Sequence, residues 1–202
     1  MAPDNRTHVK SQPALGFLTV LEHETDGLFG GYLILNLAGR PLEFHCTAPI
    51  RANRAQEILY GPTLEPYLYG EQIGQTLLDK GTVSPLVVCT DRVAALAVRE
   101  WVDLPIALVI PPEENGLVRS GTAAEAASAG KHWRVDVPHR QGPPLCHFQV
   151  GANRLAVAGR SAADRDVIAD RLRDVADSFD LAEPFCRIRE AIEEARGGGP
   201  QP

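Results

Sequence analysis

The stretch LVVCTDRVAAL, residues 86–96, decides the expected fold. Its first part is a short apolar run rich in β-branched residues, which is typical of a strand covered on both faces. A helical pattern starts after Asp91, and a second apolar run, PIALVI, follows at residues 105–110. A strand, a helix and a strand in this order predict a parallel βαβ unit with a right-handed crossover.

Three strand-like segments precede this unit, at residues 16–27, 30–39 and 42–48. The turn dipeptide Asp26-Gly27 and the glycines between the segments predict an antiparallel three-stranded meander. A short helix with Asn53 as its N-cap and a longer helix over residues 63–81 should then lead to the βαβ unit.

The second half of the chain repeats strands before helices. Residues 131–137, 144–150 and 153–159 are strand-like. Residues 161–179, with a capping box of Ser161 and Asp164, and residues 181–195 have amphipathic helical patterns.

We therefore expect an α/β (or α+β) protein. It has a mixed sheet of an antiparallel three-stranded meander plus parallel βαβ strands, flanked by helices and followed by a smaller β-meander and two helices. The expected organisation is a disordered tail (1–13), an α/β domain (14–112), a flexible loop (113–130), a meander with two helices packing on the first part (131–196) and a disordered tail (197–202).

The composition limits the partners. The net charge of -6 disfavours a broad nucleic-acid-binding surface, which needs clustered Lys and Arg to replace counterions. No apolar run approaches the length of about 18 residues that a membrane span needs. The polar start, MAPDNRTHVKSQPAL, lacks the apolar core of a secretory signal, so we expect a cytoplasmic protein without a membrane contact.

The four cysteines favour a reduced core role over a metal site. Cys46, Cys89, Cys146 and Cys186 are far apart and form no C-x-x-C pair. His45-Cys46 and Cys146-His147 are adjacent pairs in strands, and strand neighbours point to opposite faces, so each pair offers one ligand to a given site.

Three short sequence segments within residues 16–110 resemble those of ribonuclease H-like proteins: GGYLILNLAGRPLEF, ANRAQEIL and VVCTDRVAAL. The resemblance implies a divalent-metal-dependent nuclease site, with Mg²⁺ or Mn²⁺ held by several carboxylates from strand ends and a helix start. Asp91 matches the strand-end Asp of the family, and Glu57 and either Glu22 or Glu24 are the other candidate catalytic acids. Asp164 or Asp166 could supply a last one.

The match to that site is incomplete. The helix Glu of the family aligns with Gln56, and moving to Glu57 turns the side chain by about 100° around the helix. The Asp of the first strand has no clear match, although Glu22 and Glu24 are nearby. An N-cap is the structural alternative for Asp91, because Asp often precedes a helix. The element order also fits a cytidine-deaminase-like topology, but the zinc ligands of that chemistry are absent from the sequence.

Two functions follow from these observations. The first is a non-catalytic binding or protein-interaction protein on a degenerate ribonuclease H-like scaffold, without a cofactor. Its partner would be another protein or a second copy, contacted through a strand edge or through the aromatic region around Tyr67 and Tyr69. The alternative is a metal-dependent phosphoryl-transfer enzyme that uses Asp91, Glu57 and Glu22 or Glu24.

Overall fold

The described residues form one mixed sheet with helices on both faces. The structure, a computed structural model, describes residues 12–111 and 144–197. Its strands are β1 (Ala14–His23), β2 (Gly27–Asn36), β3 (Pro41–Cys46), β4 (Val88–Thr90), β5 (Ile106–Ile110), β6 (Leu145–Val150) and β7 (Asn153–Ala158). Its α-helices are α1 (Arg54–Tyr60), α2 (Leu64–Pro66), α3 (Thr76–Lys80), α4 (Asp164–Leu172) and α5 (Glu183–Gly197). Its other helices are η1 (Gly61–Thr63), η2 (Tyr67–Gln75), η3 (Val93–Glu100) and η4 (Gly159–Ser161).

The sheet confirms the expected mixed α/β architecture. The seven strands have the order β3-β2-β1-β4-β5-β7-β6. β1, β2 and β3 pair antiparallel, whereas β1, β4 and β5 pair parallel. β7 pairs antiparallel with β5, so the hairpin of β6 and β7 extends the first sheet instead of forming another one.

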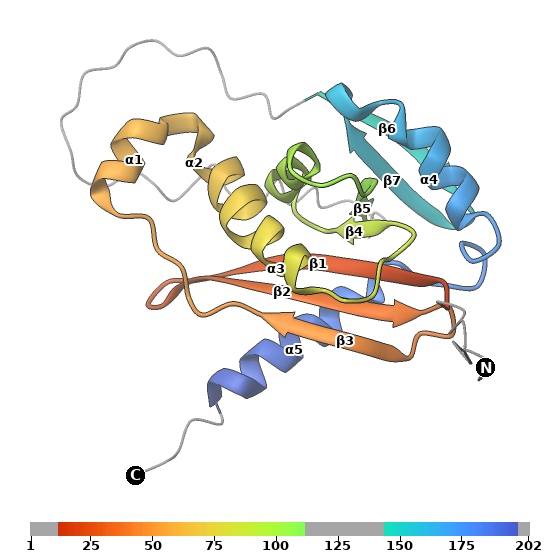
Figure 1. The fold of residues 1–202 in the computed structure, drawn as a ribbon, viewed down its shortest axis with the longest axis horizontal. Coiled ribbons are helices and arrows are strands. Elements are labelled where there is room, and N and C mark those ends of the chain that lie inside the picture. The colour runs from red at the N-terminus through yellow and green to blue at the C-terminus, as the bar shows by residue number, and fades with distance from the viewer. Residues whose placement is uncertain (1–11, 112–143, 198–202) are drawn as a thin grey trace, which may run out of the picture.

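Alternation along β1 creates two apolar cores. Leu15 and Phe17 face α4 and α5 on one side of the sheet. Leu18 and Val20 face η2, α3 and η3 on the other side. Figure 1 shows α5 behind the sheet and the segment from α2 to α3 in front of it. Successive side chains of a strand point to opposite faces, so a polar residue in β1 is assigned to one layer by its position alone.

The helices follow the predicted order but differ in detail. Asn53 caps α1 as predicted, because its side chain accepts a hydrogen bond from the Gln56 N–H. The predicted long helix is present as α2, η2 and α3, and η2 is a π-helix. The helix predicted over residues 161–179 is shorter, because α4 begins at Asp164 and ends at Leu172.

Ser161 does not form the predicted capping box: it belongs to η4, and Ala163 precedes α4 without a side-chain cap. Asp164 instead forms an ion pair with Arg99 at 2.6 Å. This tertiary partner was not visible in the local pattern. The predicted strand at 131–137, the flexible loop and most of both tails lie outside the described residues.

The glycine at position 31 lets α5 cross the sheet closely. A Cβ atom at Gly31 would lie 2.9 Å from Ile192 Cδ1 and still closer to Ile188 Cγ2. Both isoleucines are buried in the core between the sheet and α5. The absence of a side chain at this position therefore fixes how closely the helix approaches β2.

Replacing Gly31 with Ala should destabilise the protein. The added methyl group must displace branched carbons near the α5 backbone, and overpacking of this kind costs about 1–3 kcal/mol. The free energy of unfolding from urea titration checks this. Gly197→Ala is the control, because a Cβ there meets nothing within 4 Å. An equal effect of the two substitutions would contradict the close contact.

Glu43 in β3 holds the segment after α3. Its carboxylate accepts hydrogen bonds from the backbone N–H of Thr82 and Val83 and from the Thr82 hydroxyl, and His45 Nε2 lies 3.0 Å from it. Burial raises the pKa of Glu43, but these hydrogen bonds outweigh it and lower the pKa from 4.5 to about 2. The contacts therefore favour the charged carboxylate in the folded state.

Acid should weaken the fold through this group. Because the folded pKa of Glu43 lies below its unfolded value, its contribution is complete above pH 4.5 and is lost as the pH falls towards about 2. The free energy of unfolding of Glu43→Gln should therefore fall less steeply than that of the wild type across this window. The exposed Glu194→Gln is the control, and equal slopes for wild type and Glu43→Gln would contradict the assignment.

Candidate functional site

Asp91 lies where the carboxyl ends of β1 and β4 meet. The two strands are parallel, and Leu18 pairs with Thr90 in their register. One residue further, Asp91 is placed beside Thr19. Thr19 lies two residues after Phe17, and Asp91 lies two residues after Cys89, so each has the same face as that neighbour. Phe17 and Cys89 belong to the core on the α5 side of the sheet. The side chains of Thr19 and Asp91 therefore point towards α5.

Two groups occupy the carboxylate of Asp91. The Thr19 hydroxyl donates a hydrogen bond to Oδ1 at 2.5 Å, and the Arg189 guanidinium of α5 donates one to Oδ2. Arg92 Nε lies 4.0 Å from Oδ1. The Asp91 side chain is 14% exposed, so these partners replace most of its contact with water.

The interpretation of Asp91 as a helix N-cap is wrong. Arg92 precedes η3, and no side chain caps that helix. The Thr90 hydroxyl, not Asp91, accepts a hydrogen bond from the Arg92 N–H. Asp91 points to the α5 side because of its position directly after β4, and there it meets the Arg189 guanidinium, which the local sequence does not reveal.

Glu22 points to the other side of the sheet. It pairs with Leu28 in β2, and Leu28 packs against the core on the η2 side. The Tyr69 hydroxyl of η2 donates a hydrogen bond to Glu22 Oε1. Burial raises the pKa of Tyr69, and the bond to Glu22 raises it further, so the phenol stays protonated as the donor.

The other candidate acids are also engaged elsewhere. Glu57 on α1 is 45% exposed and forms an ion pair with Arg54 at 2.9 Å. Glu24 is exposed in the turn after β1. Asp164 pairs with Arg99, and Asp166 with Arg165.

These acids do not fit the divalent-metal site that the resemblance implies. Such a site needs several carboxylates converging on one point, but Asp91 and Glu22 point to opposite faces of the sheet. Across residues 12–111 and 144–197, no three His, Cys, Asp or Glu side chains form a group that could hold a metal ion. Catalytic and metal-binding roles for Asp91, Glu57, Glu22 or Glu24 stay predictions.

The two tyrosines proposed as contact residues differ in position. Tyr69 is buried, and its hydroxyl is used by Glu22. Tyr67 is half-buried, and its ring stacks on Tyr60 with centroids 4.1 Å apart. A partner could therefore reach Tyr67 more easily than Tyr69, and the contact itself stays a prediction.

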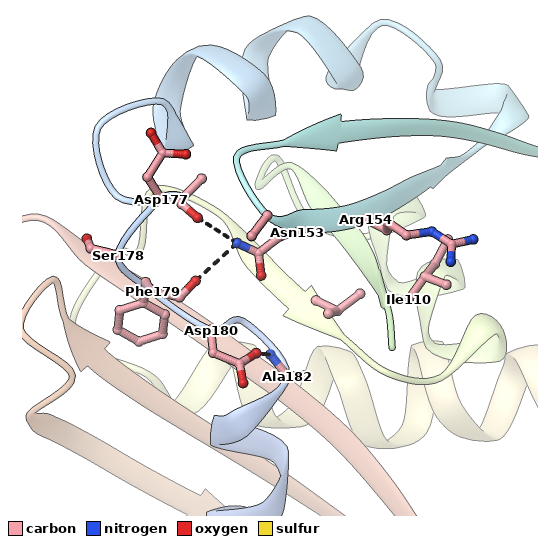
Figure 2. A pocket seen from close by; sticks show the side chains of 11 residues that line it. Ile110, Asn153, Arg154, Asp177, Ser178, Phe179, Asp180 and Ala182 are labelled. Atoms are coloured by element: carbon pink, nitrogen blue, oxygen red, sulfur yellow. Dashed lines mark hydrogen bonds between the residues drawn. The ribbon is translucent and has the colours of Figure 1, made fainter. Parts of the chain in front are cut away.

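A pocket of about 460 Å³ lies between the start of β7 and the turn after α4. Figure 2 shows Asn153 reaching across its wall. The Asn153 amide donates to the carbonyl oxygens of Ala176 and Phe179, and its oxygen accepts from the Leu181 N–H. These bonds fix the turn that forms the wall, so we assign Asn153 a structural role and the pocket no ligand.

The thiols do not assemble a metal site within the described chain. β3, with Cys46, and β6, with Cys146, are opposite edges of the sheet. Cys89 is fully buried, and burial raises the pKa of its thiol to about 12. Cys89 is therefore a neutral core side chain, as the sequence predicted.

Thiol labelling should separate the four cysteines. Cys46 and Cys186 are exposed and should react with Ellman's reagent in the native protein, whereas Cys146 is half-buried and should react more slowly. Cys89 should react only after unfolding, because the thiolate is the reactive form. Counting released chromophore with and without denaturant checks this, and rapid native modification of Cys89 would contradict its placement.

Comparison with known proteins identifies no family. No protein-family profile and no curated protein sequence matches the chain. The crystal structure of human endonuclease V (ENDOV) is similar at a TM-score of 0.41 and 14% sequence identity, over 93% of this chain and 87% of that one. This neighbour is a nuclease by name, but we draw no functional conclusion from a likeness this weak.

None of the helices in the described residues is both long and apolar enough to cross a bilayer.

Proposed function

We propose that the protein is a non-catalytic binding or protein-interaction protein on a degenerate ribonuclease H-like scaffold. One observation supports the non-catalytic part of this proposal. Both oxygens of the Asp91 carboxylate are occupied, one by Thr19 and one by Arg189. A carboxylate that holds a guanidinium in place is a structural anchor, and it attaches α5 to the central strands.

The local charge supports this role. Arg189 compensates Asp91 directly, and Arg92 lies close by. A site for two divalent cations needs an excess of carboxylate charge. Binding a cation at Asp91 would first require breaking its ion pair, which would leave the Arg189 guanidinium beside the metal.

The protein-binding part rests on apolar side chains at the surface of α1. Ile58 is 67% exposed and Leu59 is 81% exposed. α1 buries none of its own residues, and it lies apart from the sheet in Figure 1. Adjacent large aliphatic side chains on a helix are typical of a surface that contacts another protein.

The alternative is a metal-dependent phosphoryl-transfer enzyme, and one observation favours it. Asp91 occupies the end of β4 beside β1, as the resemblance to ribonuclease H-like proteins implies. In this alternative, a substrate or metal would draw Arg189 away and free the carboxylate. Glu22 and Glu57 would have to reorient to join it.

Metal titration separates the two functions. We expect calorimetry to detect no Mg²⁺ or Mn²⁺ binding that depends on Asp91, either in the wild type or in Arg189→Met, which removes the competing cation. Asp91→Asn is the reference for nonspecific binding. Binding by the wild type or by Arg189→Met that disappears in the corresponding Asp91→Asn background would favour the enzyme and justify nuclease assays.

The same ion pair should contribute to stability. Arg189→Met leaves a mostly buried carboxylate without its cationic partner, so the free energy of unfolding should fall by about 1–3 kcal/mol. Arg173→Met is the control, because its pair with Asp170 is exposed and should contribute at most a few tenths of a kcal/mol. Denaturant unfolding measures both, and a neutral Arg189→Met would show that Asp91 does not anchor α5.

A further inference from the structure

β3 forms an open edge of the sheet. It pairs with β2 on one side, and in the described residues no strand pairs with its other side. Figure 1 shows β3 along the lower border of the sheet, away from β4 and β5. An open edge presents unpaired backbone donors and acceptors to another strand.

The side chains of β3 alternate in chemistry. Leu42 and Phe44 are 39% and 40% exposed, and Cys46 is exposed as well. Phe44 pairs with Leu33, so these three side chains lie on the sheet face that α5 covers further inward. Glu43 and His45 point to the opposite face. One face of the edge is therefore apolar and the other is polar.

The open backbone groups belong to the same residues as the apolar side chains. The Thr47 N–H donates to the Gly30 carbonyl at 3.0 Å, which places Thr47 in a hydrogen-bonded pair with β2. Bonded and non-bonded pairs alternate along antiparallel strands. By this alternation, His45 and Glu43 bond towards β2, and the backbone groups of Phe44 and Cys46 point outward. The register shifts between Ile34 and Leu35, so Leu42 has no partner in β2.

We propose that β3 pairs antiparallel with β3 of a second copy, around a twofold axis at Phe44. The outward N–H and C=O groups of the two Phe44 residues then bond each other. The apolar face that carries Phe44 and Cys46 then continues across the junction. The seven-stranded sheets join into one continuous sheet.

The chemistry of the edge selects a second copy of this chain as the occupant. The sequence Leu-Glu-Phe-His-Cys is symmetric by class around Phe44: apolar, acidic, aromatic, basic and apolar. In the antiparallel pairing, the Glu43–His45 pair of each copy, which is closed within that copy at 3.0 Å, lies beside the same pair of the other copy, whereas a parallel arrangement would not close on itself. A twofold interface requires this kind of self-complementarity.

The expected dimer is of modest affinity. Pairing through one short strand buries less than the roughly 1,200 Å² of a standard interface, so dissociation in the micromolar range is expected. Sedimentation of the full chain over about 1–300 µM should show a mass rising from the 21.9 kDa monomer towards twice that value.

Substitution at the axis tests the register. Phe44→Glu places two like charges opposite each other and should weaken dimerisation at least tenfold. Val167→Glu introduces the same charge at an exposed apolar position on α4 and should leave the dimer unchanged. If Leu59→Glu dissociates the dimer and Phe44→Glu does not, α1 and not β3 is the interface.

Disulfide trapping gives a second test that does not depend on disrupting the edge. In a background with Cys46, Cys146 and Cys186 replaced by Ser, Phe44→Cys should oxidise to a linked dimer, because paired Cα atoms about 5.5 Å apart lie in disulfide range. Leu59→Cys in the same background is the control for random collision.

The outcomes are decisive in both directions. A concentration-dependent dimer that Phe44→Glu weakens and Phe44→Cys traps supports the proposal. A monomeric mass over the whole range, or trapping no faster than with Leu59→Cys, overturns it. Neither result depends on whether Asp91 binds metal, so the edge proposal and the proposed function stand or fall separately.

Discussion

Burial of β1 on both faces is the constraint on which the rest of the structure depends. β1 lies between β2 of the meander and β4, and its side chains alternate between two apolar cores. The alternation leaves no freedom in the direction of a side chain once the register is set. It sends Thr19 towards α5 and Glu22 towards η2, so two polar residues only three positions apart belong to different layers.

Because Thr19 and Glu22 face different layers, the ends of β1 and β4 do not bring two carboxylates together. In the site implied by the resemblance, acids from neighbouring strands meet at one point. Here Thr19 is the β1 residue that meets Asp91, and a hydroxyl contributes no negative charge. From the α5 side, Arg189 then donates a hydrogen bond to the second oxygen of the Asp91 carboxylate. Asp91 therefore has the position of the strand-end acid in that site, but its contacts are those of an ion pair within the fold.

The β3 edge of the sheet contrasts with this closed centre. In the middle, side chains such as those of Thr19, Asp91 and Tyr69 are satisfied by partners from distant parts of the chain. At β3, apolar side chains and backbone groups both face outward. Exposed apolar residues on α1 add a second surface of this kind. Within the described residues, β3 and α1 are thus the apolar surfaces without a cover, whereas beside Asp91 the buried Arg92 Nε has no hydrogen-bond partner.

Local chemistry made much of the fold predictable. The continuous apolar run of β4, the turn at Asp26-Gly27, the Asn53 cap and the stripe of Ile188 and Ile192 in α5 all depend on neighbours in sequence. The failures occurred where a distant partner overrides such patterns. Ser161 did not cap α4, because η4 intervenes, and Asp164 found Arg99 instead.

The candidate site was predictable only as a position. The sequence determined that an acid would follow β4, because an apolar run followed by Thr-Asp and a helical pattern sets the strand end. The tertiary structure alone decided the role of that acid. Its partners, Thr19 and Arg189, are 72 and 98 residues away, and only the sheet register and the packing of α5 bring their side chains to the same carboxylate.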